Sequence, residues 1–229
     1  MPFLDYLYGQ IKSTFEKYPH RFFTEHDIHS ELTMIATDLL RKEGTLTEKT
    51  KDGYMTSRIH HEYPTPFRCR MKGFQFKMIT EKEYEDEKAK NPEFRARRGW
   101  VDFVILNPYF ISSNKLGIVS AKRYSSFLES VKNEEQKYPA LDLAMEVVYY
   151  PTFDEKQHVG TMKRRVLSAK QDYDKLVALM KFPYTGKIPF CREAAMLLFS
   201  NTRYRGELVD MLKLISIDEK VSFHTILYR

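Results

Sequence analysis

Cysteine is scarce in this chain, and its scarcity argues against two kinds of structure. Cys69 and Cys191 are the two cysteines among 229 residues, they lie far apart, and neither belongs to a CxxC motif. This pattern argues against a framework of disulfide bonds and against a zinc site built on cysteine thiolates. Because structural disulfides belong to oxidising compartments, the cysteine content predicts a reducing cytoplasm as the location of the protein.

The chain also lacks the signatures of secretion, of membrane insertion and of several common enzyme classes. Its first residues show no basic segment followed by an apolar one, and no apolar run approaches the length that crosses a bilayer. We therefore expect no membrane partner. The segment Thr185-Gly186-Lys187-Ile188 lacks the first glycine and the final hydroxyl residue of a P-loop. Neither GxGxxG nor GxSxG occurs, which argues against dinucleotide binding and against a nucleophilic serine.

Positive charge and aromatic side chains are both abundant. The chain has 37 Lys and Arg against 31 Asp and Glu, which gives a formal net charge of +6 and a pI of about 9.1. A basic surface suits a polyanion such as nucleic acid, although a charge of this size also occurs in proteins that bind none. Aromatic residues make up 14% of the chain, so we expect a packed core rather than disorder.

Hydrophobic periodicity predicts helices and strands along the whole chain. Helices are expected at residues 4–18, 24–41, 80–90, 125–137, 161–180 and 201–214, and strands at 58–63, 67–79, 100–106, 141–150, 194–199 and 221–228. Within 67–79 the alternation changes phase at Gly73, which predicts a bulge or a tight hairpin there. Residues 44–57 are polar and are predicted to form a loop. This order predicts a mixed α/β sheet with helices on both faces. We expect one domain over residues 1–229, with a helical extension at 1–23 and a core at about 24–200.

Two carboxylates stand inside apolar, β-branched runs, where an unpaired charge is costly. Asp102 lies in the segment RGWVDFVIL, and Glu146 lies in LDLAMEVVYY. Alternation places Asp102 on the strand face of Val104, and Glu146 on the face of Ala144 and Val148. If the two strands pair, the carboxylates converge, and this predicts a site for a hard cation such as Mg²⁺. The alternative is that each carboxylate is paired with a buried basic residue.

The order of elements and the two carboxylates resemble the PD-(D/E)XK superfamily of restriction-endonuclease-like nucleases, from about residue 24 to 200. That family has a core of helix, three strands, helix and strand, with an aspartate at the start of the second core strand and Glu-x-Lys on the third. Asp102 and Glu146 match the two acidic positions. A glutamate on the first core helix often joins the metal site, and Glu31 is the matching candidate. The resemblance implies a restriction-endonuclease-like fold, Mg²⁺ or Mn²⁺ as cofactor, DNA as partner and a homodimer.

Val148 departs from this motif, because it stands where the family has the lysine that helps to activate the attacking water. Two explanations remain open. In the first, a lysine from elsewhere has taken over, and Lys170 is the candidate because it flanks the apolar stripe between Val166 and Tyr173. The alternative for Lys170 is a side chain that extends into solvent. In the second explanation, the site has lost catalysis and retains the fold, metal binding or DNA binding.

Clustered basic residues are candidates for binding phosphate groups. Arginine neutralises phosphates and fixes the register of a nucleic acid, whereas a single basic cluster is more often a solvated surface. From three such clusters we select Arg98, Arg164, Arg165 and Arg203.

Histidines give a weaker signal. His26 and His29 are three residues apart on a predicted helix, but no third ligand stands at metal spacing, so a solvated helix face is expected. His61 and Glu62, on the first predicted core strand, either line the same cleft as Asp102 or belong to a solvated edge strand.

We therefore expect metal-dependent hydrolysis of phosphodiester bonds in DNA. Asp102 and Glu146 would hold Mg²⁺, Glu31 would assist, and Lys170 would replace the missing lysine. The alternative is a catalytically inactive protein of the same fold that binds DNA or another protein. A third possibility is a structural protein in which both carboxylates are salt-bridged.

Overall fold

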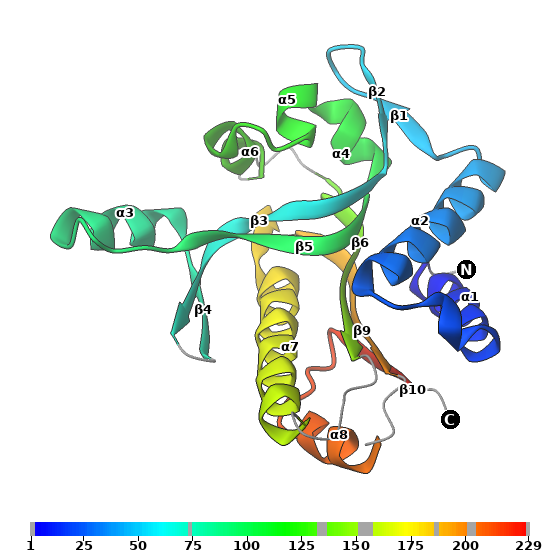
Figure 1. Cartoon of the computed structure of the whole chain (residues 1–229). Helices are drawn as coiled ribbons and strands as arrows, with labels where there is room; N and C mark the ends of the chain where they lie inside the picture. Colours follow the sequence, from blue (N-terminus) through cyan, green and yellow to red (C-terminus); the bar gives the residue numbers. More distant parts are fainter. Residues whose placement is uncertain are drawn as a thin grey trace.

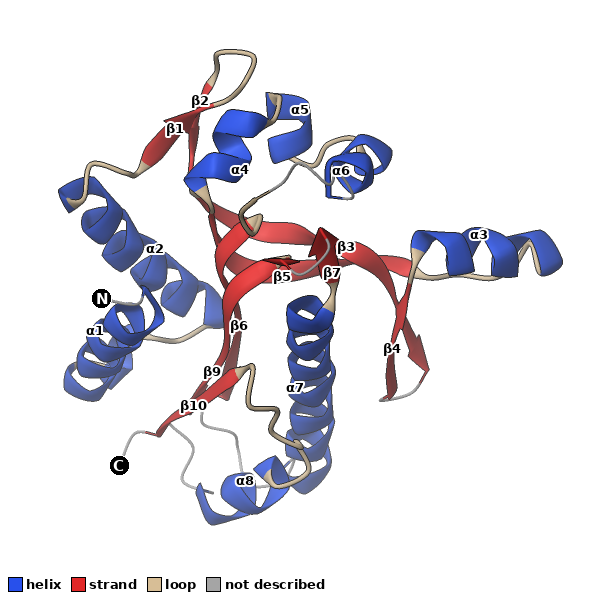
Figure 2. Ribbon diagram, turned by 180° about the vertical axis from the view of Figure 1, so that it is seen from behind, coloured by secondary structure: helices blue, strands red, loops and turns tan. Residues whose placement is uncertain are grey.

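The computed structural model describes residues 3–72, 75–131, 137–150, 158–185, 188–200 and 205–227. A six-stranded sheet forms the centre of the molecule, in the order β10–β9–β6–β5–β3–β4 (Figures 1 and 2). Its strands are β3 (Ile59–Lys72), β4 (Gln75–Ile79), β5 (Arg97–Leu106), β6 (Leu141–Tyr150), β9 (Cys191–Ser200) and β10 (Ser222–Leu227). Strands β4, β3, β5 and β6 are antiparallel neighbours, whereas β6, β9 and β10 run parallel. The sheet is therefore mixed, as the sequence predicts.

Helices cover both faces of this sheet, which confirms the predicted α/β fold class (Figures 1 and 2). The helices are α1 (Phe3–Lys17), α2 (Glu25–Lys42), α3 (Glu81–Lys90), α4 (Pro108–Ser113), α5 (Leu116–Val119), α6 (Tyr124–Val131), α7 (His158–Lys181) and α8 (Arg205–Leu212). On one face, α1 and α2 pack against Phe103 and Met145. On the other, α7 packs against Val104 and Ala144. Within the described ranges, no helix is both long and apolar enough to cross a bilayer.

Helix α2 begins one residue after the predicted start at residue 24, and Thr24 is its N-cap. The hydroxyl of Thr24 accepts a hydrogen bond from the backbone N–H of Asp27, and the Asp27 carboxylate accepts one from the backbone N–H of Thr24. Four apolar residues form the buried face of the helix: Ile28, Leu32, Ala36 and Leu40. Glu25, the first helical residue, precedes Ile28 by three positions and therefore starts on the same face.

Several segments differ from the sequence prediction. Helices α4 and α5 are not predicted, whereas the division of the segment 67–79 between the antiparallel strands β3 and β4 agrees with the hairpin alternative. Pro64 and Pro66 are expected to end a strand, but β3 continues through them, because its register with β5 shifts between Pro64 and Arg68. A bulge of this kind interrupts the ladder, so the prolines need not donate a backbone hydrogen bond. The predicted loop at 44–57 contains a hairpin of β1 (Thr47–Lys49) and β2 (Met55–Ser57), whose strands are too short and too exposed to show apolar alternation.

The shorter elements are mostly connections. They include a 3-10 turn η1 (Pro19–Arg21) between α1 and α2, and a small hairpin of β7 (Pro183–Thr185) and β8 (Ile188–Pro189). Of the helix predicted at 125–137, α6 supplies the first part, and residues 132–136 lie outside the described residues.

Strands β5 and β6 separate halfway along their length. Their ladder runs from Leu106 opposite Leu141 to Phe103 opposite Met145, and it ends there. Beyond this point β5 pairs with β3 alone, while β6 pairs with β9 as far as Tyr150. Figure 1 shows β5 turning toward α3 and β6 toward β10, with α7 between the diverging strands. The first residues beyond the ladder can therefore be reached from the helices.

Candidate active site

The separation of β5 and β6 brings the two predicted carboxylates together. Asp102 and Glu146 are the first residues beyond the ladder, and its register continues to set them opposite each other. The backbone N–H of Val147 donates a hydrogen bond to Asp102 Oδ2 at 3.0 Å, so Asp102 bridges the opening between the strands. Both carboxylates line one cavity.

This first cavity has a volume of about 520 Å³ and gathers polar side chains from α2, β5, β6 and α7. Its polar and charged lining residues are Thr24, Glu25, Asp102, Glu146, Arg165, Ser168 and Asp172. Four carboxylates from different parts of the chain thus face the same space.

Helix α2 contributes Glu25 to this cavity and not Glu31, which corrects the sequence prediction. Glu31 lies on another flank of the helix, where its Oε2 is 3.6 Å from Arg21 Nη2. Glu25 accepts a hydrogen bond from the backbone of Tyr149. One turn further along α2 lies His29. Glu25, His29 and Asp102 each offer a ligand atom, and these three atoms lie within 4.8 Å of one another.

The lysine beside Glu146 is Lys175 of α7. Its Nζ lies 2.8 Å from Glu146 Oε1 and 3.1 Å from Asp172 Oδ1. Lys175 is 7% exposed and Glu146 is 2% exposed, so the pair is shielded from solvent. Burial acts to lower the pKa of Lys175, but the carboxylates of Glu146 and Asp172 outweigh it and raise that pKa. The amine therefore stays protonated, and it can neutralise negative charge but cannot act as a base.

Lys170 does not reach the carboxylates, which corrects the second prediction. Its Nζ lies 2.6 Å from Asp174 Oδ2, one turn along α7. It lines a different cavity, together with Arg70 and Lys77. Lys170 and Lys175 are therefore on different flanks of α7, and only Lys175 contacts Glu146 among the lysines of the described residues.

The rotation of α7 explains this difference. The predicted stripe is centred on Val166 and Tyr173. In the structure, the buried apolar residues of α7 are Val166, Ala169, Tyr173, Leu176 and Leu179. Because Ala169, Leu176 and Leu179 lie to one side of the predicted stripe, the helix turns its Asp172 and Lys175 flank toward β5 and β6.

Negative charge at this site is energetically costly. Burial raises the pKa of Glu146 well above its ordinary value, and Asp102 adds to the rise while Lys175 opposes it. Burial also raises the pKa of Asp172 against the influence of Lys175. Partial burial, with Asp102 nearby, raises the pKa of Glu25. A divalent cation would relieve all three costs, since a bound ion is the largest local charge in such a site.

A second cavity, of about 360 Å³, adjoins the first, because Glu25 and Asp102 line both. Its other lining residues are His26, His29, Ser30, Thr33, His61 and Glu62. His29 Nε2 is buried and accepts or donates no hydrogen bond among the described residues. Burial lowers the pKa of His29, although Asp102 opposes this, so the ring is neutral and suited to binding a metal. The prediction of a solvated helix face therefore holds for His26, which is exposed, but not for His29.

The predicted phosphate-binding arginines occupy different places. Arg165 lines the first cavity, and its Nη1 donates a hydrogen bond to the carbonyl of Tyr149 at 3.4 Å. Arg164 is exposed on α7 and lines none of these cavities. Arg203 lies outside the described residues. Arg98 lines a third cavity, which Asp102 and Lys175 also line.

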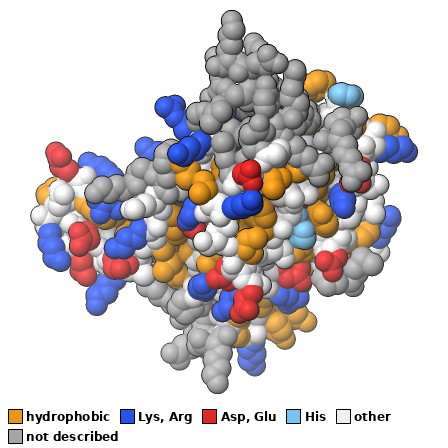
Figure 3. Space-filling view, turned by 90° about the horizontal axis from the view of Figure 1, so that it is seen from below, with side chains coloured by type: hydrophobic (Ala, Val, Ile, Leu, Met, Phe, Trp, Pro, Cys, Tyr) orange, Lys and Arg blue, Asp and Glu red, His pale blue; other side chains and the backbone are white. Residues whose placement is uncertain are grey.

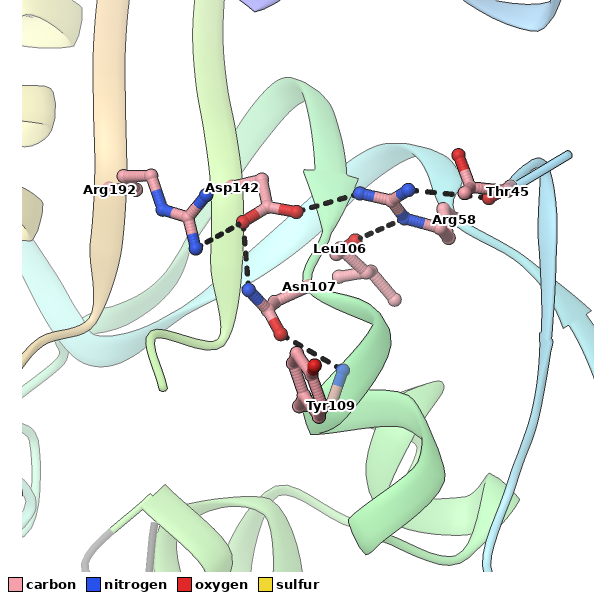
Figure 4. A network of polar contacts seen from close by, with 7 residues as sticks. All are labelled: Thr45, Arg58, Leu106, Asn107, Tyr109, Asp142 and Arg192. Carbon is pink, nitrogen blue, oxygen red and sulfur yellow. Dashed lines mark hydrogen bonds and ion pairs between the residues drawn. The ribbon is translucent and has the colours of Figure 1, made fainter. Parts of the chain in front are cut away.

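Asp142, on the same strand as Glu146, is a buried carboxylate with a structural role. Arg58 Nη2 donates to Asp142 at 2.7 Å and Asn107 Nδ2 at 2.8 Å, and Arg192 Nη2 lies 3.2 Å away (Figure 4). Arg58 also donates from Nε to the carbonyl of Leu106 at 2.9 Å. This network joins β6 to its neighbours at the end of the sheet where β5 and β6 are paired.

The alternative that each of the two carboxylates pairs with a buried basic residue therefore holds for Glu146, which pairs with Lys175, but not for Asp102 within the described residues. Glu25 and Asp102 form no ion pair with a lysine or arginine in the ranges that the structure describes. The carboxylates at the separation of the strands are thus the ones left for another partner.

Comparison of the chain with models of protein families, with curated proteins and with solved structures finds no match. Sequence reasoning missed Glu25, Asp172 and Lys175, and it assigned His29 to a solvated helix face. The spacing of Glu25, His29, Leu32 and Ala36 by four, three and four positions is a helical-face pattern that contains two of them.

Proposed function

We propose that this protein hydrolyses phosphodiester bonds in DNA with the help of a divalent cation, Mg²⁺ or Mn²⁺. The observation that carries the proposal is the convergence of Glu25, Asp102 and Glu146 with Lys175 where β5 and β6 separate. The resemblance to PD-(D/E)XK nucleases supports it. In this proposal Glu25 takes the position of the helix glutamate, and Lys175 replaces the lysine that is absent at Val148.

The donor set fits such a cation. Glu25 and Asp102 offer carboxylate oxygens, which are the preferred ligands of Mg²⁺ and Mn²⁺. His29 offers a nitrogen close to both, and imidazole is a ligand of transition-metal ions. Binding a cation would also offset the repulsion that raises the pKa values of Glu25 and Glu146.

Each residue has a role that follows from its position. Glu25 and Asp102 would hold the cation, with Glu146 as a further ligand. When bound, the cation polarises a phosphoryl oxygen and lowers the pKa of a water molecule. Lys175, which Glu146 holds in its protonated form, would stabilise the negative charge that develops on the phosphoryl oxygens during attack. Arg165, in the same cavity, would bind a neighbouring phosphate.

A cleavage assay tests this proposal. The full chain is incubated with single-stranded, duplex and branched DNA in Mg²⁺ or Mn²⁺, with EDTA as the metal-free condition. We expect cleavage only with a divalent cation. Asp102→Asn should cut DNA at least about 100-fold more slowly than the wild type. Loss of a metal ligand should reduce activity more than loss of a group that only supports a ligand, which typically costs about 10-fold to about 100-fold. Asp174→Asn, on the flank of α7 that carries Lys170, should cut at the wild-type rate. Failure to cut any DNA form, or an unimpaired Asp102→Asn, contradicts the proposal.

A DNA-binding protein without catalysis is the second candidate, and the ion pair between Lys175 and Glu146 favours it. In this pair, at 2.8 Å, the charge of Lys175 opposes that of Glu146 without a cation, although the contact lacks the geometry of a hydrogen bond at Glu146 Oε1. The second candidate predicts DNA binding that weakens with salt, no cleavage, and no effect of Mn²⁺ on thermal stability. The proposed nuclease instead predicts that Mn²⁺ raises the melting temperature, because a ligand that binds the folded state stabilises it.

A further inference from the structure

The third cavity is lined with arginine and contains the single tryptophan of the chain. Its volume is about 590 Å³, within the range of small-molecule binding sites. It is lined by Cys69, Arg70, Arg95, Arg97, Arg98, Gly99, Trp100, Asp102 and Lys175. Because Asp102 and Lys175 also belong to the carboxylate cluster, this cavity opens directly beside the proposed site of hydrolysis.

The positive charge in this cavity is not neutralised by ion pairs among the described residues. None of its four arginines forms an ion pair with a carboxylate of the described residues. Arg95 and Arg98 each donate a hydrogen bond to a backbone carbonyl at 2.9 Å, and the Arg70 guanidinium lies over an aromatic ring. Arg70, Arg95 and Arg97 are exposed. Such arginines remain available for phosphate oxygens.

Trp100 adds an aromatic surface to this charge. Its side chain is 48% exposed, and the guanidinium of Arg98 lies 5.0 Å from its ring centroid. The preceding Gly99 is pressed against β3, because a Cβ added there would lie 2.5 Å from Thr65 Oγ1. The backbone that carries Trp100 is therefore fixed. An exposed aromatic side chain among arginines is the combination by which proteins bind unpaired bases together with their phosphates.

We infer that this cavity binds an unpaired nucleotide of a DNA strand, with Trp100 stacked on the base and the arginines on the neighbouring phosphates. The inference rests on the proposed function for the identity of the polymer and for the position of the bond that is cut. Inside a duplex, each base is already stacked on its neighbours and presents no free face. A stacking side chain beside the reacting phosphate therefore selects single strands, frayed ends and flaps over fully paired DNA.

The fluorescence of Trp100 reports directly on this cavity, because the chain has no other tryptophan. The full chain is titrated in EDTA, which prevents metal-dependent cleavage, with an oligothymidylate and with a blunt duplex of equal length. We expect the oligothymidylate to quench the emission and to bind at least about tenfold more tightly than the duplex. In an anisotropy assay with labelled oligothymidylate, Trp100→Ala should bind about fivefold to about 150-fold more weakly. Trp100→Phe should retain most of the affinity, because it keeps an aromatic face.

The matched control is Tyr54→Ala, which removes an exposed aromatic side chain from the turn between β1 and β2 and should bind like the wild type. Equal affinity for oligothymidylate and duplex, or full affinity in Trp100→Ala, overturns the inference even if the protein cuts DNA. Quenching by oligothymidylate in a protein that cuts no DNA supports the nucleotide site and contradicts the proposed function instead.

Discussion

Lys175 and Lys170 lie on the same helix, but they differ in burial, and their ion pairs therefore contribute differently to stability. The Lys175 side chain is 9% exposed and pairs with Glu146, whereas the Lys170 side chain is 30% exposed and pairs with Asp174 one turn away. Helical surface pairs such as Lys170–Asp174 contribute about 0.3–0.5 kcal/mol. Removing one partner of a buried pair costs about 3–5 kcal/mol, because the other charge is left without compensation.

Replacing each lysine in turn tests this difference. Lys175→Ala should lower the free energy of unfolding by about 3–5 kcal/mol and abolish cleavage. Lys170→Ala should lower it by less than about 0.5 kcal/mol and leave cleavage unchanged. Urea denaturation and the cleavage assay measure both effects. The double variant Lys175→Met/Glu146→Gln should recover stability but not cleavage, and a Lys175→Ala protein that cuts normally would refute the assigned role.

Glu25 is a second residue whose ionisation should affect stability. Partial burial and the nearby Asp102 raise its pKa in the folded protein above the ordinary value of 4.5. The folded state then binds the proton more tightly than the unfolded state, so ionisation of Glu25 reduces stability as the pH rises above 4.5. Because Glu25 is exposed and solvent screens its charge, Glu25→Gln in EDTA at pH 7 should raise the melting temperature only slightly, by up to roughly 1 °C.

Well below pH 4.5 this gain should disappear, because the carboxyl group is protonated in both states. Calorimetry in EDTA across this pH range measures the effect, with Glu31→Gln as the matched control on the same helix. A melting temperature lowered by Glu25→Gln at pH 7 would mean that the carboxylate stabilises the metal-free protein, contrary to this account.

Among the elements, strand β5 positions the site through its close contact with β3. A Cβ at Gly99 would lie 2.5 Å from Thr65 Oγ1 and 2.7 Å from Cys69 Sγ, both of which belong to β3. The close approach of these strands fixes the part of β5 that carries Trp100 and Asp102.

Gly99→Ala should therefore lower the free energy of unfolding by about 1–3 kcal/mol, because the two strands must move apart. Cleavage should also slow, since Asp102 is displaced with the strand. Gly9→Ala is the control: nothing lies within 4 Å of a Cβ there, and its place in α1 predicts a gain of up to about 1 kcal/mol. Thermal denaturation of both variants should show these opposite changes in stability. A stabilised Gly99→Ala would contradict the close contact between β5 and β3.

Elements with strong apolar patterns are predictable from this sequence. The bounds of β6 agree with the prediction, and α2 begins at its capping box. The β1–β2 hairpin is missed because its residues are exposed and polar. The continuation of β3 through Pro64 is missed because it depends on a bulge opposite β5.

The residues of the candidate site also differ in whether the sequence predicts them. The meeting of Asp102 and Glu146 follows from alternation along two consecutive strands that pair. The choice of Glu25 over Glu31, and of Lys175 over Lys170, depends on how α2 and α7 are rotated against the sheet. That rotation is set by the tertiary packing of the two helices against the sheet. The apolar stripe in the sequence of a helix does not fix which of its two flanks faces the site.

The whole molecule has a net positive charge, whereas the first cavity is lined by several carboxylates. The formal net charge is +6, yet four carboxylates line the first cavity. Figure 3 shows basic side chains on the arm formed by α3 and β4, interspersed with acidic ones. Under the proposed function, attraction for DNA would come from local groups of cations, such as the arginines that line the third cavity together with Trp100 and Asp102.

Salt dependence tests this distribution. If the four arginines of the third cavity contact phosphates of a single strand, the logarithm of the binding constant should fall with the logarithm of salt concentration with a slope of about −3. Arg97→Ala should reduce the magnitude of the slope by about 0.7. Arg41→Ala, at the far end of α2, is the control and should leave it unchanged. Binding in EDTA that is insensitive to salt would contradict phosphate contacts by these arginines.

Binding of Mn²⁺ to the full chain, followed by the electron paramagnetic resonance signal of the free ion, tests directly whether Glu25 and Asp102 form a metal centre. We predict saturable binding, which Glu25→Gln and Asp102→Asn should each weaken by more than about tenfold. Glu31→Gln and Asp174→Asn should bind Mn²⁺ like the wild type, because neither residue lines the first cavity. Absence of saturable binding, or unchanged binding in Asp102→Asn, would contradict a metal centre where β5 and β6 separate.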